Sequence, residues 1–318
     1  MLLSYWPRLF CLLLFSMGVT QIALGLLLRS AMPFVDGSIG QMTARCQERI
    51  RFAIPATPHV VALLLALLIM APQYFRNETN PLQEHVGIAC VIGASAVAVR
   101  YFYGFLRAAL LLLKEHQTYN LNGVPVALTG GVQAHISEAT HPLLAVTGIL
   151  SPRILISRHL LNHLTFSQEQ LEIALAHEGA HVSHHDNLKH LMLSSFCSGK
   201  DVFLRRWRQA AEIAADDDAA AGNSSRAILL AETLLIAARI IPDRRTSILA
   251  LDLRPHEEEL DRRIDRLLCD HSAYAPATAP RWRQIMGATA LVLVGICTLL
   301  QFFAEPLHEI SEYVLHLG

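Results

Sequence analysis

The segment His177-Glu178-Gly179-Ala180-His181 has the residue types and spacing of a metal-dependent hydrolytic site. On a helix, the two histidines lie one turn apart on the same face. Both imidazoles can then reach one Zn²⁺ at about 2.0–2.1 Å. Glu178 lies at the edge of that face, where its carboxylate can accept a proton from water without being a ligand. The pattern predicts a zinc site with its own general base.

A helix over residues 167–191 is expected to carry this segment. Ser167 followed by Gln170 is a capping-box pattern that marks the start of a helix. The alternative is a solvated, histidine-rich helix face, because His184, His185 and His190 follow in the same stretch.

A second helix, over roughly residues 202–221, offers a third ligand. Glu212 and Asp216 are four residues apart and share a face of it. We expect Glu212 to bind the metal and Asp216 to orient a ligating imidazole by accepting its other N–H. An exposed acidic helix end is a sufficient explanation for the neighbouring Asp217 and Asp218.

Composition excludes several other classes of protein. Lys+Arg 26 against Asp+Glu 27 gives a net charge of −1, so we expect no nucleic-acid partner. The six cysteines contain no Cys-x-x-Cys pair, which argues against a disulfide scaffold and a cysteine zinc site. Hydrophobic residues make up 53% and charged residues 17%, with a mean hydropathy of +0.36. Much of this apolar surface is expected to face a lipid bilayer.

Four apolar stretches are long enough to cross a bilayer. They are residues 9–28, 54–72, 86–106 and 284–304. The first reads as a retained anchor rather than a cleaved signal peptide, because Arg29 stands where small residues should mark cleavage. Arg100 interrupts the third stretch, and we expect its side chain to extend to the lipid headgroups.

Lysine and arginine placement predicts the orientation. The connection between the first two spans has Arg29, Arg45, Arg49 and Arg51, whereas the next connection has only Arg76. The residues after the last span include no lysine or arginine. We therefore expect the connection between the first two spans and residues 115–283 in the cytoplasm, with both termini outside.

These elements predict a mainly α membrane protein with a cytoplasmic α+β domain, a small β-sheet plus helices, inserted between spans three and four. Residues 1–114 hold three spans, residues 115–283 the inserted domain, residues 284–304 the fourth span, and residues 305–318 a short external tail. Three short β-type runs open the insert, at residues 124–128, 143–146 and 153–157.

The motif pattern resembles the BlaR/MecR-type membrane zinc metallopeptidases, gluzincins with H-E-x-x-H and E-x-x-x-D motifs. The resemblance rests on His177–His181, then Asp186, then Trp207 and the Glu212-x-x-x-Asp216 pair, and it covers about residues 86–270. More distantly, the chain is similar to HtpX and the CAAX prenyl endopeptidases.

The resemblance implies a membrane zinc peptidase with His177, His181 and Glu212 as ligands and Glu178 as the catalytic base. Asp216 and Asp186 would support the ligands. In the more distant relatives a histidine and an arginine stabilise the transition state, and His256 and Arg263 are the possible counterparts here. The beta-lactam sensors carry an external penicillin-binding domain, whereas only residues 305–318 follow the last expected span. We therefore expect no sensor domain in this chain.

The sequence thus favours a multi-pass cell-membrane zinc endopeptidase acting on cytoplasmic or membrane-associated proteins, in regulatory proteolysis. A protein or peptide substrate and the lipid bilayer are its expected partners. Two alternatives stay open. One is a signal transducer whose sensing is done by a partner protein. The other is a non-catalytic membrane scaffold that holds a structural zinc.

Overall fold

The computed structural model describes residues 2–77, 84–119, 124–127, 133–138, 144–149, 151–162, 166–197, 201–240 and 257–269. These residues divide into two compact units. Described residues of the first unit lie within Met1–Gln41 and Ala53–Gly104, and those of the second within Met42–Phe52 and Phe105–Ala277. The expected fourth span, residues 284–304, and the candidate His256 lie outside the described residues.

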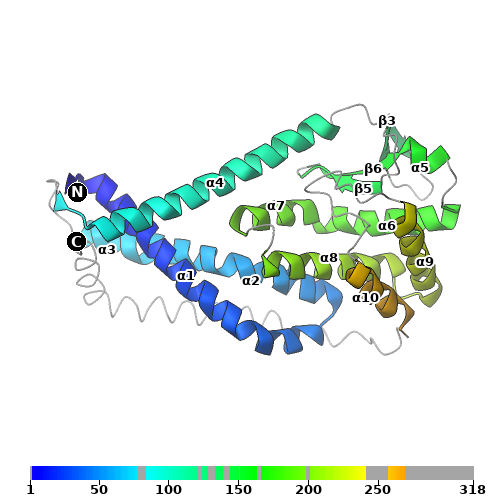
Figure 1. Ribbon diagram of the computed structural model, residues 1–318, viewed down its shortest axis with the longest axis horizontal. Coiled ribbons are helices and arrows are strands. Elements are labelled where there is room, and N and C mark those ends of the chain that lie inside the picture. The colour runs from blue at the N-terminus through cyan, green and yellow to red at the C-terminus, as the bar shows by residue number, and fades with distance from the viewer. Residues whose placement is uncertain are drawn as a thin grey trace. The chain divides into compact units, whose positions relative to one another are not determined.

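Three helical segments are long and apolar enough to cross a membrane, and they overlap the first three expected spans. They are Tyr5–Gly40, Ala44–Arg76 and Ile88–Leu113. Helix α1 runs from Tyr5 to Gly40 and α4 from Ile88 to Tyr119 (Figure 1). Between them, α2 (Ala44–Leu65) continues through a single π-helical stretch (Ala66–Met70) into α3 (Ala71–Asn77). A short antiparallel pair, β1 (Leu2–Leu3) with β2 (Glu84–His85), completes the first unit's described elements.

Helix α1 is longer than the span we expected, because it continues past Arg29 to Gly40 and α2 begins at Ala44. The segment expected to be an open connection is therefore almost entirely helical. The expected extension of Arg100 to the headgroups stays a prediction. Arg100 lies well inside the segment Ile88–Leu113, and its guanidinium donates to Gln21 Oε1 of α1 at 3.3 Å.

The second unit contains a four-stranded sheet in the order β3-β4-β6-β5. Its strands are β3 (Val124–Ala127), β4 (Gln133–Ser137), β5 (Leu144–Thr147) and β6 (Arg153–Ser157). The central pair β4–β6 is parallel, and the two outer pairs are antiparallel. Three strands match the expected runs, and β4 is an addition. The register pairs Ala134 with Ile154 and Leu144 with Ile156, so apolar side chains collect on one face.

Six described helices complete the second unit. They are α5 (Arg158–Asn162), α6 (Gln168–His184), α7 (Asp186–Phe196), α8 (Val202–Ala220), α9 (Ser224–Ile240) and α10 (Glu257–Leu268). The single helix expected over residues 167–191 is therefore wrong. His185 adopts the left-handed conformation, with φ 57°, and ends α6 so that α7 begins at Asp186. Histidine tolerates this conformation better than most residues.

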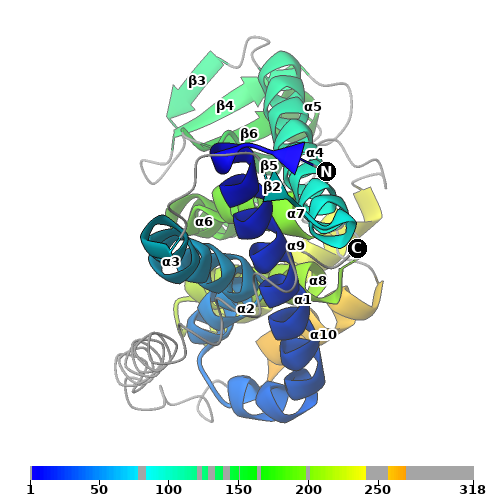
Figure 2. The same ribbon diagram turned by 90° about the vertical axis from the view of Figure 1, so that its left-hand side faces the viewer.

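The core of the second unit lies between the sheet and the helices. Helix α6 packs against β5 and β6 on one side and against α8 and α9 on the other. Figure 2 shows these elements in a second view. The buried core residues include Ile156, Leu175, Ala220 and Leu230. This packing holds α6 and α8 side by side, and these are the two helices with the candidate ligands.

Candidate metal centre

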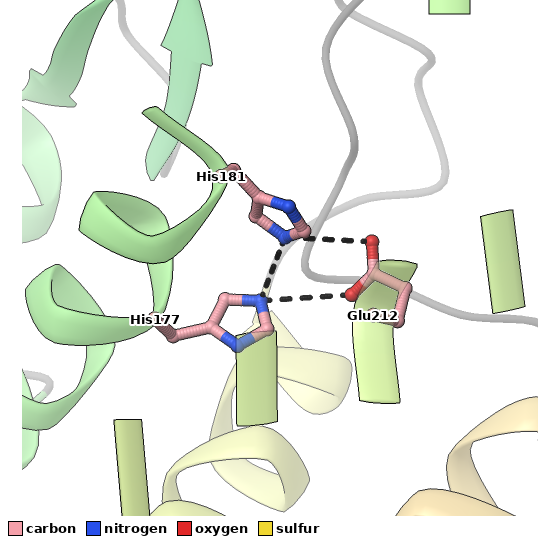
Figure 3. A group of neighbouring side chains, drawn as sticks. All are labelled: His177, His181 and Glu212. Carbon is pink, nitrogen blue, oxygen red and sulfur yellow. Dashed lines mark hydrogen bonds and ion pairs between the residues drawn. The ribbon is translucent and has the colours of Figure 1, made fainter. Parts of the chain in front are cut away.

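Helix α6 brings His177 and His181 together. The capping box at its start is formed, with the Ser167 hydroxyl accepting from Gln170 N at 3.2 Å and Gln170 Oε1 accepting from Ser167 N at 3.0 Å. His177 and His181, ten and fourteen residues after Ser167, are buried, and their Nε2 atoms lie 3.2 Å apart. Both imidazoles therefore direct Nε2 at the same point (Figure 3).

Glu212 of α8 faces that point. Its Oε2 lies 3.6 Å from His177 Nε2, and its Oε1 lies 3.8 Å from His181 Nε2. One ligand atom from each of the three residues lies within 4.8 Å of the others. Atoms that share one tetrahedral Zn²⁺ at 2.0–2.2 Å are separated by about 3.3–3.6 Å. The donor set and spacing therefore fit one such ion.

Each histidine has a carboxylate behind it. Asp216 Oδ1 lies 3.0 Å from His177 Nδ1, and Asp186 Oδ2 lies 2.8 Å from His181 Nδ1. A carboxylate at Nδ1 holds the proton there and leaves Nε2 available for a metal, which fixes the tautomer. The structure thus brings both predicted supporting residues to the imidazoles, and on different histidines.

The pKa values of these buried groups follow from that pairing. Burial opposes protonation of His177, yet hydrogen bonds to Asp216 and Glu212 leave its pKa above the ordinary value. Burial also opposes ionisation of Asp186, but His181 and then Lys189 bring its pKa below the ordinary range. Asp186 is therefore held as a carboxylate, the form that accepts the imidazole N–H.

Arg263 of α10 supplies a buried cation beside the cluster. Its guanidinium donates to Asp216 through Nε and NH2, both at 2.7 Å, and NH1 lies 2.8 Å from Glu212 Oε2. Burial opposes ionisation of Asp216 and Glu212, but the Arg263 charge brings the pKa of each below its usual range. Arg263 was a candidate for contacting the transition state, and here its described contacts are with the supporting Asp216 and the ligand Glu212.

Glu178, the candidate base, is buried on α6 next to His177. Burial opposes the charged form of Arg263, but nearby carboxylates hold its pKa above the ordinary value. Asp216 and Glu212 contribute most to this, and Glu178 contributes as well. The negative charge of Glu178 is thus close enough to act on the same arginine that contacts the ligand carboxylate.

The acidic end of α8 has partners of its own. Asp217 accepts from Arg266 NH2 at 2.9 Å, and Asp218 Oδ2 lies 2.7 Å from His184 Nε2. His184 is buried rather than part of a solvated face. The group of potential ligands found among the described residues contains neither of these aspartates.

Lys189 and Glu48 are two further residues near the cluster that the sequence did not predict. Lys189 Nζ donates to Asp186 Oδ1 at 3.1 Å and to Glu48 Oε1 at 2.7 Å. The spacing of Asp186 and Lys189 on one helix is a signal for that ion pair. No local pattern points to Glu48, which precedes Lys189 by 141 residues.

Comparison with known families gives one finding for the region that contains this cluster. Residues 127–242 match the model of peptidase family M48, a stretch from the end of β3 to just past α9 that includes all three candidate ligands. The comparison with curated proteins found no match. Residues 127–242 are thus similar to peptidase family M48, and the His-His-Glu cluster lies within this region.

Proposed function

We propose that this chain is an integral-membrane zinc endopeptidase that hydrolyses peptide bonds of cytoplasmic or membrane-associated proteins. The observation that carries the proposal is the convergence of His177, His181 and Glu212, with Glu178 buried beside them. A catalytic zinc site has three protein ligands and one open position. A closed structural site would need a fourth ligand, and the cluster found among the described residues has three.

The residues divide the work of peptide hydrolysis among them. When bound by His177, His181 and Glu212, zinc supplies a Lewis acid that polarises the carbonyl and acidifies water. Glu178 takes the proton from the attacking water and passes it to the leaving amine. Asp216 and Asp186 hold the two imidazoles in the tautomer that the metal requires.

We propose that the sheet edge at β5 contributes to binding an extended substrate, next to Val146 O, which accepts from Asn187 Nδ2 at 3.2 Å. Strand β5 lies at one end of the sheet order, paired with β6, and it packs against the metal helix α6. An added chain can pair with such an edge through main-chain hydrogen bonds. This arrangement favours a peptide substrate held in extended form alongside α6.

Cytoplasmic placement of the second unit is also part of the proposal. Residues Met42–Phe52, which lie between the expected spans 9–28 and 54–72, belong to the same unit as the inserted domain. Two spans separate these stretches along the chain, so both lie on the same side of a bilayer. That side is the arginine-rich one, which is typical of the cytoplasm. A role in regulatory proteolysis of the BlaR/MecR type stays a prediction from the motif resemblance.

Replacing the candidate base Glu178 distinguishes a zinc endopeptidase from a non-catalytic scaffold that holds a structural zinc. Full-length protein in detergent would be assayed for zinc per chain and for cleavage of an unfolded test protein. Glu178→Gln should keep zinc and lose about 10²–10⁴-fold in cleavage rate, because the amide cannot accept the proton.

His177→Ala should lose both metal and cleavage, since it removes a ligand. Glu172→Gln, on the exposed part of the same helix, is the matched control and should behave as wild type. Undiminished cleavage in Glu178→Gln would refute the mechanism. Zinc-loaded wild type without chelator-sensitive cleavage would favour the scaffold.

A further inference from the structure

Glu48 is a fully buried carboxylate in the first turns of α2, within the segment Met42–Phe52 of the second unit. Burying a carboxylate is costly unless it is paired and hydrogen-bonded. Its Oε1 accepts from Lys189 Nζ at 2.7 Å and from Trp207 Nε1 at 3.0 Å. Glu48 therefore contacts both α7, through Lys189, and α8, through Trp207.

A continuous path of polar contacts runs from Glu48 to a metal ligand. Lys189 Nζ reaches Asp186 Oδ1 at 3.1 Å, and the other oxygen of Asp186 lies 2.8 Å from His181 Nδ1. His181 Nε2 is one of the clustered ligand atoms. Three contacts thus connect α2 with a metal-facing nitrogen.

Trp207 limits how far Glu48 can move. The indole is fully buried, packs against Phe52 of α2 with ring centroids 6.4 Å apart, and stacks on His190 of α7. Trp207 also belongs to α8, the helix of the ligand Glu212. The same indole therefore fixes the position of Glu48 and packs α2 against the helix that carries the third ligand.

We propose that Glu48 is a positioning residue for the metal site, acting on His181 through Lys189 and Asp186. The inference rests on the proposed metal-binding function. Glu48 shares the Lys189 ammonium with Asp186, so Asp186 keeps enough negative charge to be a strong acceptor for His181 Nδ1–H. A strong acceptor there orients the imidazole and raises its basicity toward a metal.

The path begins in the first turns of a long apolar helical segment. Glu48 lies at the start of Ala44–Arg76, one of the apolar segments long enough to cross a bilayer. A rotation or shift of these first turns of α2 would change the charge that Asp186 presents to His181.

Glu48→Gln is the variant that isolates this role. Glutamine keeps the shape and an acceptor oxygen for Lys189 and Trp207 but removes the charge, so Lys189 acts on Asp186 alone. Full-length protein in detergent would be measured for zinc affinity by chelator competition, for the visible spectrum of bound Co²⁺, and for thermal melting. We expect zinc affinity to fall about tenfold and the Co²⁺ spectrum to change. Removing a residue that supports a metal ligand typically lowers metal affinity about 10–100-fold, and this value is at the lower end of that range.

Asp186→Asn should weaken zinc binding further, within the usual range of about 10–100-fold. In the Asp186→Asn background, Glu48→Gln should cause no additional loss, because the path passes through Asp186. Glu259→Gln is the matched control, since Glu259 also accepts a hydrogen bond from α8, from Gln209 at 2.8 Å, without contacting this path. It should leave zinc affinity and the Co²⁺ spectrum unchanged.

Unchanged zinc affinity in Glu48→Gln, with or without a lower melting temperature, would overturn the inference and leave Glu48 as a structural ion pair. Additive losses in the double variant would also overturn it. A wild-type chain that binds zinc but cleaves nothing would instead count against the endopeptidase and leave the affinity comparison valid. A wild-type chain that binds no metal would overturn both proposals.

Discussion

The two units stabilise buried polar groups in different ways. In the second unit, histidines face carboxylates, and the carboxylates face Arg263 or Lys189, so charge is balanced by charge. In the first unit, the buried, neutral amide of Gln21 accepts from Arg100, which is exposed. The hydroxyl of Tyr101 then bonds both Gln21 and His59, the latter at 3.1 Å. The described contacts of this second network join α1, α2 and α4 by hydrogen bonds.

The two units also differ in how far their apolar side chains are exposed. Ile22, Val99 and Phe102 of the first unit are 64–67% exposed, as expected for side chains that face lipid. In the second unit, Ile156, Leu230 and Leu234 are completely buried around α6. The first unit is thus built to hold helices together in an apolar medium, and the second to hold ionic groups in fixed positions. Chemistry that moves protons needs the second arrangement.

Removing the third candidate ligand, Glu212, should have the largest effect on the second unit. Glu212→Ala leaves two imidazoles without the anionic ligand, so most bound zinc should be lost. Asp217→Ala and Asp218→Ala are the matched controls and should retain zinc, because their described partners are Arg266 and His184. Metal analysis of the purified chain checks all three. Stoichiometric zinc in Glu212→Ala would show that another carboxylate is the ligand.

Removing the buried cation should have the next largest effect. Arg263→Met leaves Asp216 and Glu212 without the charge that compensates them, and breaking a buried ion pair typically costs about 3–5 kcal/mol. We expect a large fall in the free energy of unfolding of the metal-free protein, partly restored by zinc, measured by denaturation in detergent. Arg266→Met removes a more exposed pair with Asp217 and should cost less than about 1 kcal/mol. Equal losses in the two variants would contradict the charge-balance interpretation.

Local patterns predicted the parts of the site that depend on helical spacing. The four-residue spacings of His177 with His181 and of Glu212 with Asp216 place each pair on one face of α6 or α8. Apolar length predicted the three long apolar helical segments, and short β-type runs predicted β3, β5 and β6. These signals need only a few neighbouring residues, so a single sequence contains them.

The remaining features depend on contacts between distant residues. Arg263 and Glu48 reach the site across 47 and 141 residues, through Asp216 and Lys189, and no periodicity reveals such pairs. Strand β4 mixes polar and apolar residues and is a strand because β3 and β6 pair with it on both sides. The helix break at His185 is instead local, since it consists of one left-handed residue, and Asp186 directly after it bonds His181 and Lys189.

The smallest expected effect lies in the first unit, where the same kind of substitution should affect only helix association. Gln21→Leu removes the amide that accepts from Arg100 and donates to Tyr101, while leaving a side chain of similar size in α1. Hydrogen bonds between membrane helices are worth about 0.6 kcal/mol on average and about 1.7 at most. We therefore expect a modest fall in the melting temperature of the detergent-solubilised chain and no change in zinc affinity. Ser30→Ala is the matched control on the same helix, because its hydroxyl bonds only locally, to Leu26 O at 3.0 Å, and is exposed. If Gln21→Leu weakened zinc binding as much as Glu48→Gln, the neutral network would be part of the metal site's support, and the division of labour between the two units would be wrong.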